Sequence, residues 1–313
     1  MAKTTIAIVH GDPAGIGPEL LIKLLSDKKT TARANILVIG DPKVFLRGEN
    51  TVGYQIENVR HITNIKNLNF SNCNINHLDI NFEGIDGVPT AAVSATGGAS
   101  TIGGLHRALE LSKNGYVAGI VFMPFNKESM HLGGNDFNDE LGYASQFFKL
   151  KTRASEFNFA NGMWNSRVTS HVAMKDVHNL LNEDLICEEI ALTNQTLELA
   201  GYDRPRIVVS AYNPHAGDGG LMGREEIDVI APAIKRMKQK QIAVNGPLPA
   251  DTLWLKVRDG EYDAVVTMYH DQGQIAIKLL GFDRGVTVLA GLPIPITTPA
   301  HGTAFDIAGQ NKA

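Results

Sequence analysis

Three histidines in the sequence each follow a short apolar run. His171 lies in RVTSHVAMKDV, His215 in SAYNPHAGDGG and His270 in MYHDQG. Functional groups in open α/β sheets gather at the carboxyl ends of strands, so the three imidazoles can meet at one edge of a sheet. Three imidazoles can bind one divalent cation and leave a coordination position open for a substrate. Ordinary loop histidines are the alternative, because ten histidines in the chain offer many accidental triplets.

Charged side chains accompany these histidines. Asp271 follows His270 directly, Asp251 lies in GPLPADTLW, and Lys278 ends the run QIAIK. Either carboxylate can orient a metal-bound imidazole or contact a substrate, and a lysine at such a site can transfer a proton. The alternatives are a helix cap or surface position for Asp271 and a solvated surface position for Lys278.

Two glycine-containing segments are candidates for holding a cofactor. GDPAGIGPEL (11–20) follows the first apolar run, and PAHGTAFDIAG (299–309) lies near the end of the chain. Glycines permit a tight turn that exposes backbone N–H groups. The first segment is not G-x-G-x-x-G, so the Rossmann dinucleotide fingerprint is absent there. A plain strand-to-helix turn and a helix cap are the alternatives. The candidate cofactor contacts are Gly11, Asp12, His301, Gly302 and Asp306.

The elements that position these groups are short, continuous apolar runs rich in Val and Ile, typical of strands buried on both faces. The predicted strands are 5–10, 35–40, 117–123, 206–212, 262–268 and 285–291. Amphipathic stretches at 102–112, 187–199 and 225–238 predict helices between them. Strands alternating with helices predict an α/β protein with a largely parallel sheet. The asparagine-rich segment 64–77 is interpreted as a surface excursion.

Length and charge bound the class of protein. A chain of 313 residues suggests about two domains. Its 29 Lys and Arg against 33 Asp and Glu give a net charge of −4, which argues against a general nucleic-acid partner. The N-terminal apolar run is too short for a signal peptide, and no run approaches the length of a membrane span. We therefore expect a cytoplasmic enzyme or binding protein without a membrane partner.

Several longer motifs carry a resemblance. The chain is similar to the 4-hydroxythreonine-4-phosphate dehydrogenase family of pyridoxine biosynthesis in segments that run in order along its length: GDPAGIGPEL, MPFNKESMHLGG, RVTSHVAMKDV, NPHAGDGGLMGREEID, NGPLPADT, MYHDQG and HGTAFDIAG. The resemblance implies an isocitrate/isopropylmalate dehydrogenase-like fold of two α/β/α domains with the active site in the interdomain cleft. The expected domains are 1–128 with 290–313, and 129–289, the latter carrying the metal ligands and dimer contacts.

The same resemblance implies an activity. The family oxidises a secondary alcohol of a hydroxy acid with NAD or NADP and then loses carbon dioxide from the 3-keto acid. It implies that His171, His215 and His270 bind one divalent metal (Zn, Mg, Mn or Co), with the third ligand coming from the other subunit of a homodimer. It further implies that Lys278 and Asp251 belong to the substrate site.

The sequence departs from the family in the substrate pocket. Glu140 and Leu141 stand where the family has a histidine and a threonine, and Thr287 and Ile296 stand where it has an asparagine and an arginine. Arginine is the usual bidentate partner of phosphate, and a glutamate would repel a dianion. We therefore expect a substrate without phosphate, such as a cis-dihydrodiol carboxylate.

Three other functions stay open at this point. The first is a true 4-hydroxythreonine-4-phosphate dehydrogenase, or a dehydrogenase of a four-carbon sugar-acid phosphate. The second is a phosphate acyltransferase on a related fold, which would not need three histidines and a lysine at strand ends. The third is a non-catalytic ligand-binding protein that kept the fold.

Overall fold

The chain folds into two compact units. A computed structural model describes residues 3–71, 73–137, 139–281 and 284–313. One unit comprises Met1–Lys149 and Pro293–Ala313, and the other comprises Leu150–Leu292. The ranges expected from the sequence place 129–149 in the second unit, whereas the contacts of this segment lie in the first. No described helix is long and apolar enough to cross a bilayer.

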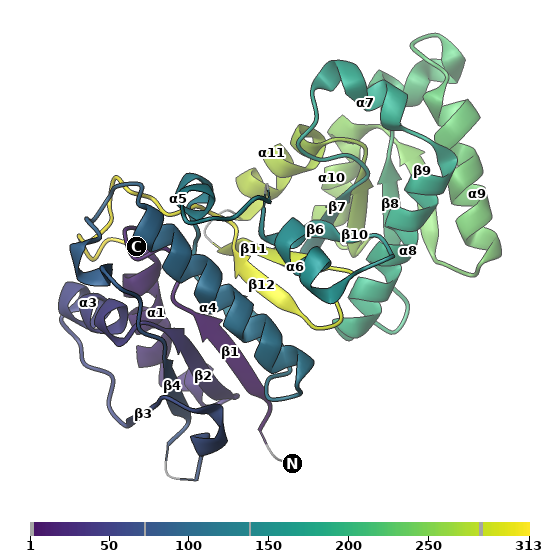
Figure 1. The fold of residues 1–313 in the computed structure, drawn as a ribbon. Helices are drawn as coiled ribbons and strands as arrows, with labels where there is room; N and C mark the ends of the chain where they lie inside the picture. The colour runs from purple at the N-terminus through teal and green to yellow at the C-terminus, as the bar shows by residue number, and fades with distance from the viewer. Residues whose placement is uncertain (1–2, 72, 138, 282–283) are drawn as a thin grey trace. The chain divides into compact units, whose positions relative to one another are not determined.

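The first unit has a fully parallel sheet with the strand order β3-β4-β2-β1-β5-β12. Helix α4 packs on β1, β2 and β5 and crosses one face of the strands (Figure 1). The strands are β1 (Thr5–Val9), β2 (Asn35–Gly40), β3 (Val59–Ile62), β4 (Ile75–Asp79), β5 (Gly119–Phe122) and β12 (Ile296–Pro299). The α-helices are α1 (Gly17–Ser26), α2 (Lys28–Thr31), α3 (Pro42–Val52), α4 (Ala95–Lys113), α5 (Lys127–Leu132) and α6 (Glu140–Phe148).

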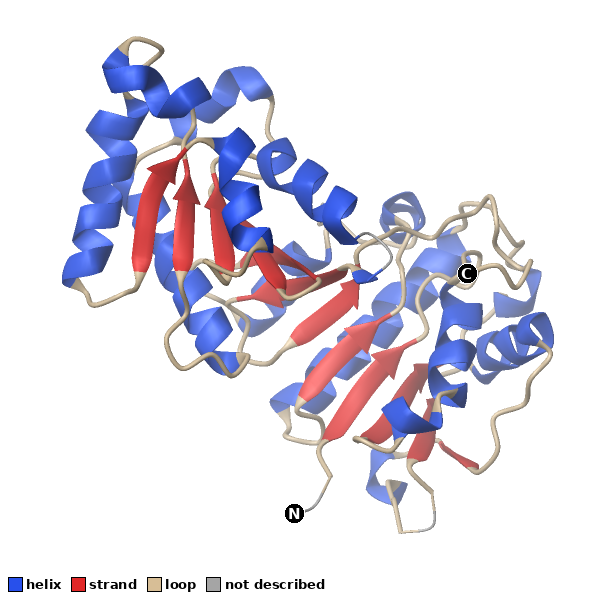
Figure 2. Ribbon diagram, turned by 180° about the vertical axis from the view of Figure 1, so that it is seen from behind, coloured by secondary structure: helices blue, strands red, loops and turns tan. Residues whose placement is uncertain are grey.

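The second unit has a mixed sheet with the strand order β11-β6-β7-β10-β8-β9. The last four strands are parallel, and β11 and β6 are joined antiparallel. Helices flank the strands of each unit (Figure 2). The strands are β6 (Ser155–Ala160), β7 (Met163–Arg167), β8 (Ile207–Ser210), β9 (Val244–Leu248), β10 (Ala264–Thr267) and β11 (Val286–Ala290). The helices are α7 (Met174–Leu180), α8 (Glu183–Leu199), α9 (Ala231–Gln239), α10 (Ala250–Arg258) and α11 (His270–Gly281).

The predicted α/β class is confirmed, and each predicted strand contains an observed one. The interpretation of 64–77 as a surface excursion is wrong at its end, because this segment runs into strand β4. Asn76 and His77 in this strand are fully buried. Their polar side chains hide the strand from a search for apolar runs, and hydrogen bonds satisfy them instead: Asn76 donates to the carbonyl of Asn69 at 3.0 Å.

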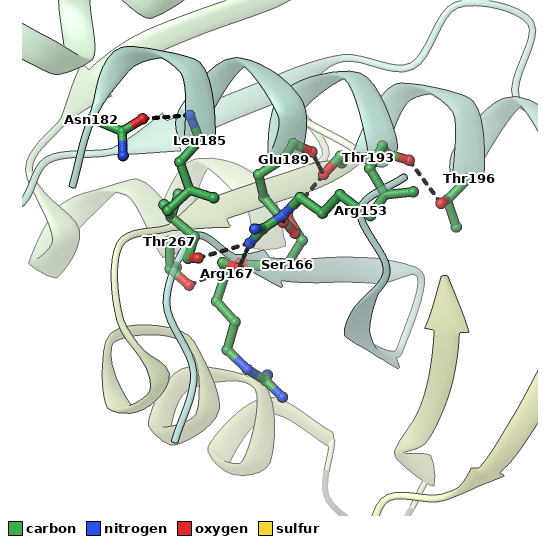
Figure 3. Close-up of polar contacts among 11 residues, drawn as sticks. Arg153, Ser166, Arg167, Asn182, Leu185, Glu189, Thr193, Thr196 and Thr267 are labelled. Carbon is green, nitrogen blue, oxygen red and sulfur yellow. Dashed lines mark hydrogen bonds and ion pairs between the residues drawn. The ribbon is translucent and has the colours of Figure 1, made fainter. Parts of the chain in front are cut away.

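A buried polar cluster fixes helix α8 on strand β7, the strand that leads to His171 (Figure 3). Glu189 of α8 is fully buried and forms an ion pair with Arg153. The guanidinium of Arg153 also donates to the carbonyl of Val168 at 2.7 Å, just beyond the end of β7. One turn along α8, the hydroxyl of Thr193 lies 2.8 Å from that of Ser166 in β7. The end of β7 is therefore held by charge and hydrogen bonds as well as by apolar packing.

Removing the cation of this cluster should destabilise the second unit. We expect Arg153→Met to lower the free energy of unfolding by about 3 kcal/mol at pH 7, because Glu189 would remain buried without its partner. Lys151→Met, which removes an exposed cation two residues away, is the matched control and should change stability little. Chemical denaturation of both variants measures the difference.

The loss of stability in Arg153→Met should depend on pH through the carboxyl of Glu189. Burial raises the pKa of this carboxyl, the cation of Arg153 opposes the shift, and losing the cation should raise the pKa further. The unfolded chain releases the proton above the ordinary value of 4.5, so the stability of the variant falls as pH rises through and above this value. The deficit relative to the parent should shrink below about pH 4. An equal loss of unfolding free energy at pH 7 and below about pH 4 would show that the unpaired charge of Glu189 is not the cause of the loss.

Candidate active site

The three predicted metal ligands follow three neighbouring parallel strands of the second unit. Strand β10 lies between β7 and β8. His171 follows β7, His270 is the first residue of α11 after β10, and His215 lies in the turn Pro214–Gly220 after β8. The rings of His171 and His270 have centroids 5.6 Å apart. The fold therefore brings all three histidines to the carboxyl end of one sheet, as expected for functional groups in an α/β protein.

In the described part of a single chain, these three imidazoles do not form a complete metal site. Among the described residues, one group of three ligand side chains has its ligand atoms all within 4.8 Å of one another, and it is His61, His77 and Asp79 in the first unit. The pair of His171 and His270 thus needs a further ligand, from a movement of the His215 turn or from another chain.

The backbone of Met268 joins the strand ends that carry the histidines. Its carbonyl accepts a hydrogen bond from the hydroxyl of Thr169 at 2.7 Å, which ties the end of β7 to the end of β10. Its N–H donates to Oε1 of Gln272 at 2.7 Å, and Nε2 of Gln272 donates to the carbonyl of Ala211 beyond β8 at 2.6 Å. A single glutamine in the first turn of α11 carries no sequence signal for this bridging role, and the sequence pattern did not reveal it.

The turn that contains His215 depends on a buried carboxylate. Glu226 is 3% exposed, and its Oε1 accepts the backbone N–H groups of Tyr212 at 2.8 Å and Asn213 at 2.7 Å. Its Oε2 accepts the side-chain amide of Asn213 at 3.0 Å. His215 itself has a left-handed φ of 53°, a conformation that costs a non-glycine residue energy and persists where surrounding contacts impose it. Glu226 supplies such contacts and was also missed, because it resembles any helix-start acid.

Asp271 lies where it can orient His270. Its Oδ1 is 2.7 Å from Nδ1 of His270. When the imidazole donates Nδ1–H to this carboxylate, its Nε2 lone pair is left for a cation, the arrangement common around metal-bound histidines. Asp251 is exposed in the first turn of α10, in the same unit.

Lys278 lies about two helical turns after His270. Both residues belong to α11, and eight residues at 1.5 Å of rise separate them by about 12 Å along the helix axis. Lys278 is exposed in the last turn, where a cation also interacts favourably with the helix dipole.

The two segments predicted to hold a cofactor pack against each other in the first unit. The backbone N–H of Ile16 donates to the carbonyl of Thr303 at 3.0 Å. A Cβ atom on Gly15 would lie 2.7 Å from the Cβ of Thr303, so only glycine allows this approach. Gly302 and Asp306 are exposed, His301 is partly exposed with Nδ1 3.0 Å from the carbonyl of Gly302, and Gly11 is buried with a φ of +82°.

Asp12 has a structural role in this turn. Its side chain is fully buried, and Oδ1 accepts the N–H of Ala14 at 2.8 Å. Burial raises the pKa of the Asp12 carboxyl, and the hydrogen bond with Ala14 acts in the opposite direction. Since no surface of the side chain is exposed, a direct contact with a cofactor is not supported for Asp12.

The four positions where the sequence departs from the family have different surroundings. Glu140 and Leu141 open helix α6, which Asp139 caps by accepting the N–H of Gly142 at 2.8 Å. An acid in a first turn is favoured by the helix dipole, which explains Glu140 without reference to a substrate. Thr287 accepts a hydrogen bond from Nδ2 of Asn158 at 3.2 Å. Ile296 is fully buried in β12, which does not support a substrate contact.

Comparisons with known proteins identify the class. A family model for the pyridoxal phosphate biosynthetic protein PdxA matches residues 32–313. A Pseudomonas aeruginosa relative with the provisional name 4-hydroxythreonine-4-phosphate dehydrogenase 2 is 47% identical over 98% of this chain and 92% of its own length. The D-threonate 4-phosphate dehydrogenase of Pectobacterium atrosepticum is 36% identical over 98% of this chain and 94% of its own. The chain belongs to the PdxA family.

Solved structures agree with this assignment. The 4-hydroxythreonine-4-phosphate dehydrogenase of Klebsiella pneumoniae aligns with a TM-score of 0.86 and 36% identity, over 100% of this chain and 95% of that chain. A terephthalate 1,2-cis-dihydrodiol dehydrogenase from Burkholderia xenovorans aligns with a TM-score of 0.68 and 25% identity, over 100% of this chain and 94% of that chain. The expected unphosphorylated dihydrodiol substrate is therefore not supported, since the relatives with greater similarity are named for phosphorylated compounds.

Removing the side-chain amide of Gln272 should weaken the hydrogen-bonded link between the ends of β10 and β8. We expect Gln272→Ala to lower the free energy of unfolding by about 2 kcal/mol, because two neutral hydrogen bonds are lost. Amide hydrogen exchange at Met268 should accelerate at least tenfold, since its N–H loses its acceptor. Ile275→Ala, at a 60% exposed position of the same helix, is the control for changes in helix propensity. Unchanged exchange at Met268 would show that the bridge does not hold the strand ends.

Proposed function

We propose that this protein is an NAD(P)-dependent dehydrogenase that oxidises the secondary alcohol of a phosphorylated four-carbon 3-hydroxy acid, with decarboxylation of the product. The observation that carries the proposal is the convergence of His171, His215 and His270 at the ends of three adjacent parallel strands. Membership of the PdxA family supports it, because the relatives named above are dehydrogenases.

The histidines suit a divalent cation. Imidazole is the ligand type that zinc and similar divalent ions prefer, and the Asp271 carboxylate 2.7 Å from Nδ1 of His270 leaves the outer nitrogen available. When bound, the ion would supply Lewis acidity toward the alcohol and keto oxygens of the substrate. Since one chain brings two of the three rings together, the ion is proposed to lie between the two subunits of a homodimer.

The other side chains have separate roles. The alcohol carbon gives up a hydride, which the nicotinamide accepts, and the hydroxyl gives up a proton, for which Asp251 and Lys278 are the candidate acceptors. The resulting 3-keto acid breaks its bond to the carboxyl carbon and releases carbon dioxide, and a proton returns to the carbon left behind. Asp271 acts through His270 by fixing the direction of its ring.

The cofactor is assigned to the first unit. Gly11 and the backbone of the turn that follows it, together with His301, Gly302 and Asp306, form the two packed segments that would contact NAD or NADP. Only Asp12 is removed from the expected set of contacts, because its side chain is fully buried and its Oδ1 accepts the N–H of Ala14.

A phosphorylated substrate is favoured over an unphosphorylated one. The names of the Pseudomonas, Pectobacterium and Klebsiella relatives all specify a 4-phosphate. Lys278 and Arg284 are exposed cations at and beyond the end of α11, and both can attract a dianion. Glu140 does not oppose this assignment, since its place in the first turn of α6 accounts for it.

A two-part substrate panel tests the proposal. We expect reduction of NAD or NADP, in the presence of a divalent metal, with 4-hydroxythreonine 4-phosphate or D-threonate 4-phosphate. The dephosphorylated acids and cis-dihydrodiol carboxylates should react at least a hundredfold more slowly in kcat/KM, because charge-assisted contacts to phosphate are lost. Turnover of the unphosphorylated compounds alone would refute the phosphate assignment. No nicotinamide binding, with or without metal, would favour a non-catalytic binding protein.

A pair of lysine variants separates the roles of Lys278. Lys278→Met should raise KM at least tenfold if the ammonium binds phosphate, and should lower kcat by about a hundredfold if it transfers the proton. Lys256→Met removes an exposed lysine from the neighbouring helix α10 and should leave both constants unchanged.

Mixing two inactive variants tests the shared site. His171→Ala and His215→Ala should each abolish activity alone, because each loses one ligand. In a mixed dimer, one of the two sites regains all three histidines if the partner supplies His215 to the pair of His171 and His270, so about a quarter to a half of the activity should return. A confirmed mixed dimer without activity would show that His171 and His215 of one site come from the same chain.

A further inference from the structure

A second group of metal-ligand side chains lies in the first unit and shares no residue with the proposed metal site of the second unit. His61 on edge strand β3 pairs directly with His77 on β4. Asp79 is two residues beyond His77, and side chains two apart on a strand share one face. The parallel register therefore places the three side chains together on one face of the sheet.

The ligand atoms are already in contact. Oδ1 of Asp79 lies 2.6 Å from Nδ1 of His77 and 2.8 Å from Nδ1 of His61. The two imidazole rings have centroids 4.9 Å apart. Within the described part of the chain, no other set of three His, Cys, Asp or Glu side chains has its ligand atoms this close.

We propose that His61, His77 and Asp79 form a zinc-binding site. Two imidazole nitrogens and one carboxylate oxygen are a donor set that zinc accepts, with water as the fourth ligand of a tetrahedron. Bond lengths near 2.0–2.1 Å place tetrahedral ligands about 3.3 Å apart, so the present hydrogen-bonded atoms need to separate by roughly half an ångström. His61 has 45% of its side chain exposed, so it can make this movement and water can reach the site.

A third histidine, His10, lies within hydrogen-bond distance of His77. Nε2 of His10, at the end of β1, lies 2.9 Å from Nε2 of His77. The ring reaches this position because Gly40 on the intervening strand β2 has no side chain, and a Cβ atom there would lie 2.5 Å from the His10 ring. If zinc takes Nδ1 of His77, the proton of this ring moves to Nε2 and is donated to His10. Metal-bound histidines usually have such an outer partner.

The proposed site has a definite consequence for the fold. Strand β3 is the edge of its sheet and has only four residues. A zinc ion bound by β3 and β4 would link this edge strand to its neighbour. Because the ion binds the folded chain, it would stabilise the first unit by an amount that rises with the logarithm of its free concentration.

Zinc stoichiometry tests the site independently of the proposed dehydrogenase centre. The full-length double variant His171→Ala/His270→Ala removes two of the three other candidate metal ligands and serves as the background. We expect about one tightly bound zinc per chain after dialysis, measured by atomic emission, and a zinc-dependent rise in Tm. Adding His61→Ala or Asp79→Asn should weaken zinc binding at least tenfold, consistent with the loss of a ligand.

The control is a histidine in a similar setting without a third ligand. His106→Ala removes an exposed histidine of the same unit whose Nε2 lies 3.7 Å from Glu110, and it should leave the stoichiometry at one. The metal-free Tm of each variant verifies folding. Zinc retained by both His61→Ala and Asp79→Asn, or no bound zinc in the background variant, would overturn the proposal and leave the group as a hydrogen-bonded network.

Discussion

The arrangement of the candidate active site depends on the peptide groups of Met268. Its carbonyl holds Thr169 and its N–H holds Gln272, which in turn holds the carbonyl of Ala211. Three separate strand ends are thereby fixed relative to one another before any ligand is present. Each bond alone contributes only about 1 kcal/mol, but together they determine where three histidines from distant parts of the sequence lie. Preorganisation of this kind lets a site bind an ion without paying for the ordering of its loops.

The sequence predicted the strands well where burial was achieved by apolar side chains. Runs such as 35–40 and 262–268 are buried on both faces, so continuous Val and Ile residues reveal them. Strand β4 is equally buried but carries Asn76 and His77, whose burial is made possible by hydrogen bonds rather than by hydrophobicity. A rule based on apolar runs cannot detect such a strand, because the partners that make its burial possible come from elsewhere in the chain.

The roles of acidic residues were also hard to predict from the sequence alone. Asp12 was expected to contact a cofactor and Glu140 to lie in the substrate pocket, whereas Asp271 was expected either to orient a metal-bound imidazole or to contact the substrate. The structure uses Asp12 to close a turn and places Glu140 in a first helical turn, while Asp271 lies against an imidazole. A carboxylate accepts hydrogen bonds equally well from a backbone amide, a helix start or a histidine. The sequence motif identifies the residue type, and only the local backbone decides which of these donors it meets.

The length of α11 constrains how its two ends can act on one substrate. His270 and Lys278 are about 12 Å apart along the helix axis, so their side chains can contact different parts of one extended substrate. If the cation at His270 contacts the alcohol, the ammonium of Lys278 is better placed for a group at the other end of an extended substrate. Arg284, also exposed, follows α11 and adds a second positive charge beyond the helix. Under the proposed function, a terminal phosphate of the substrate would fit this separation of charges.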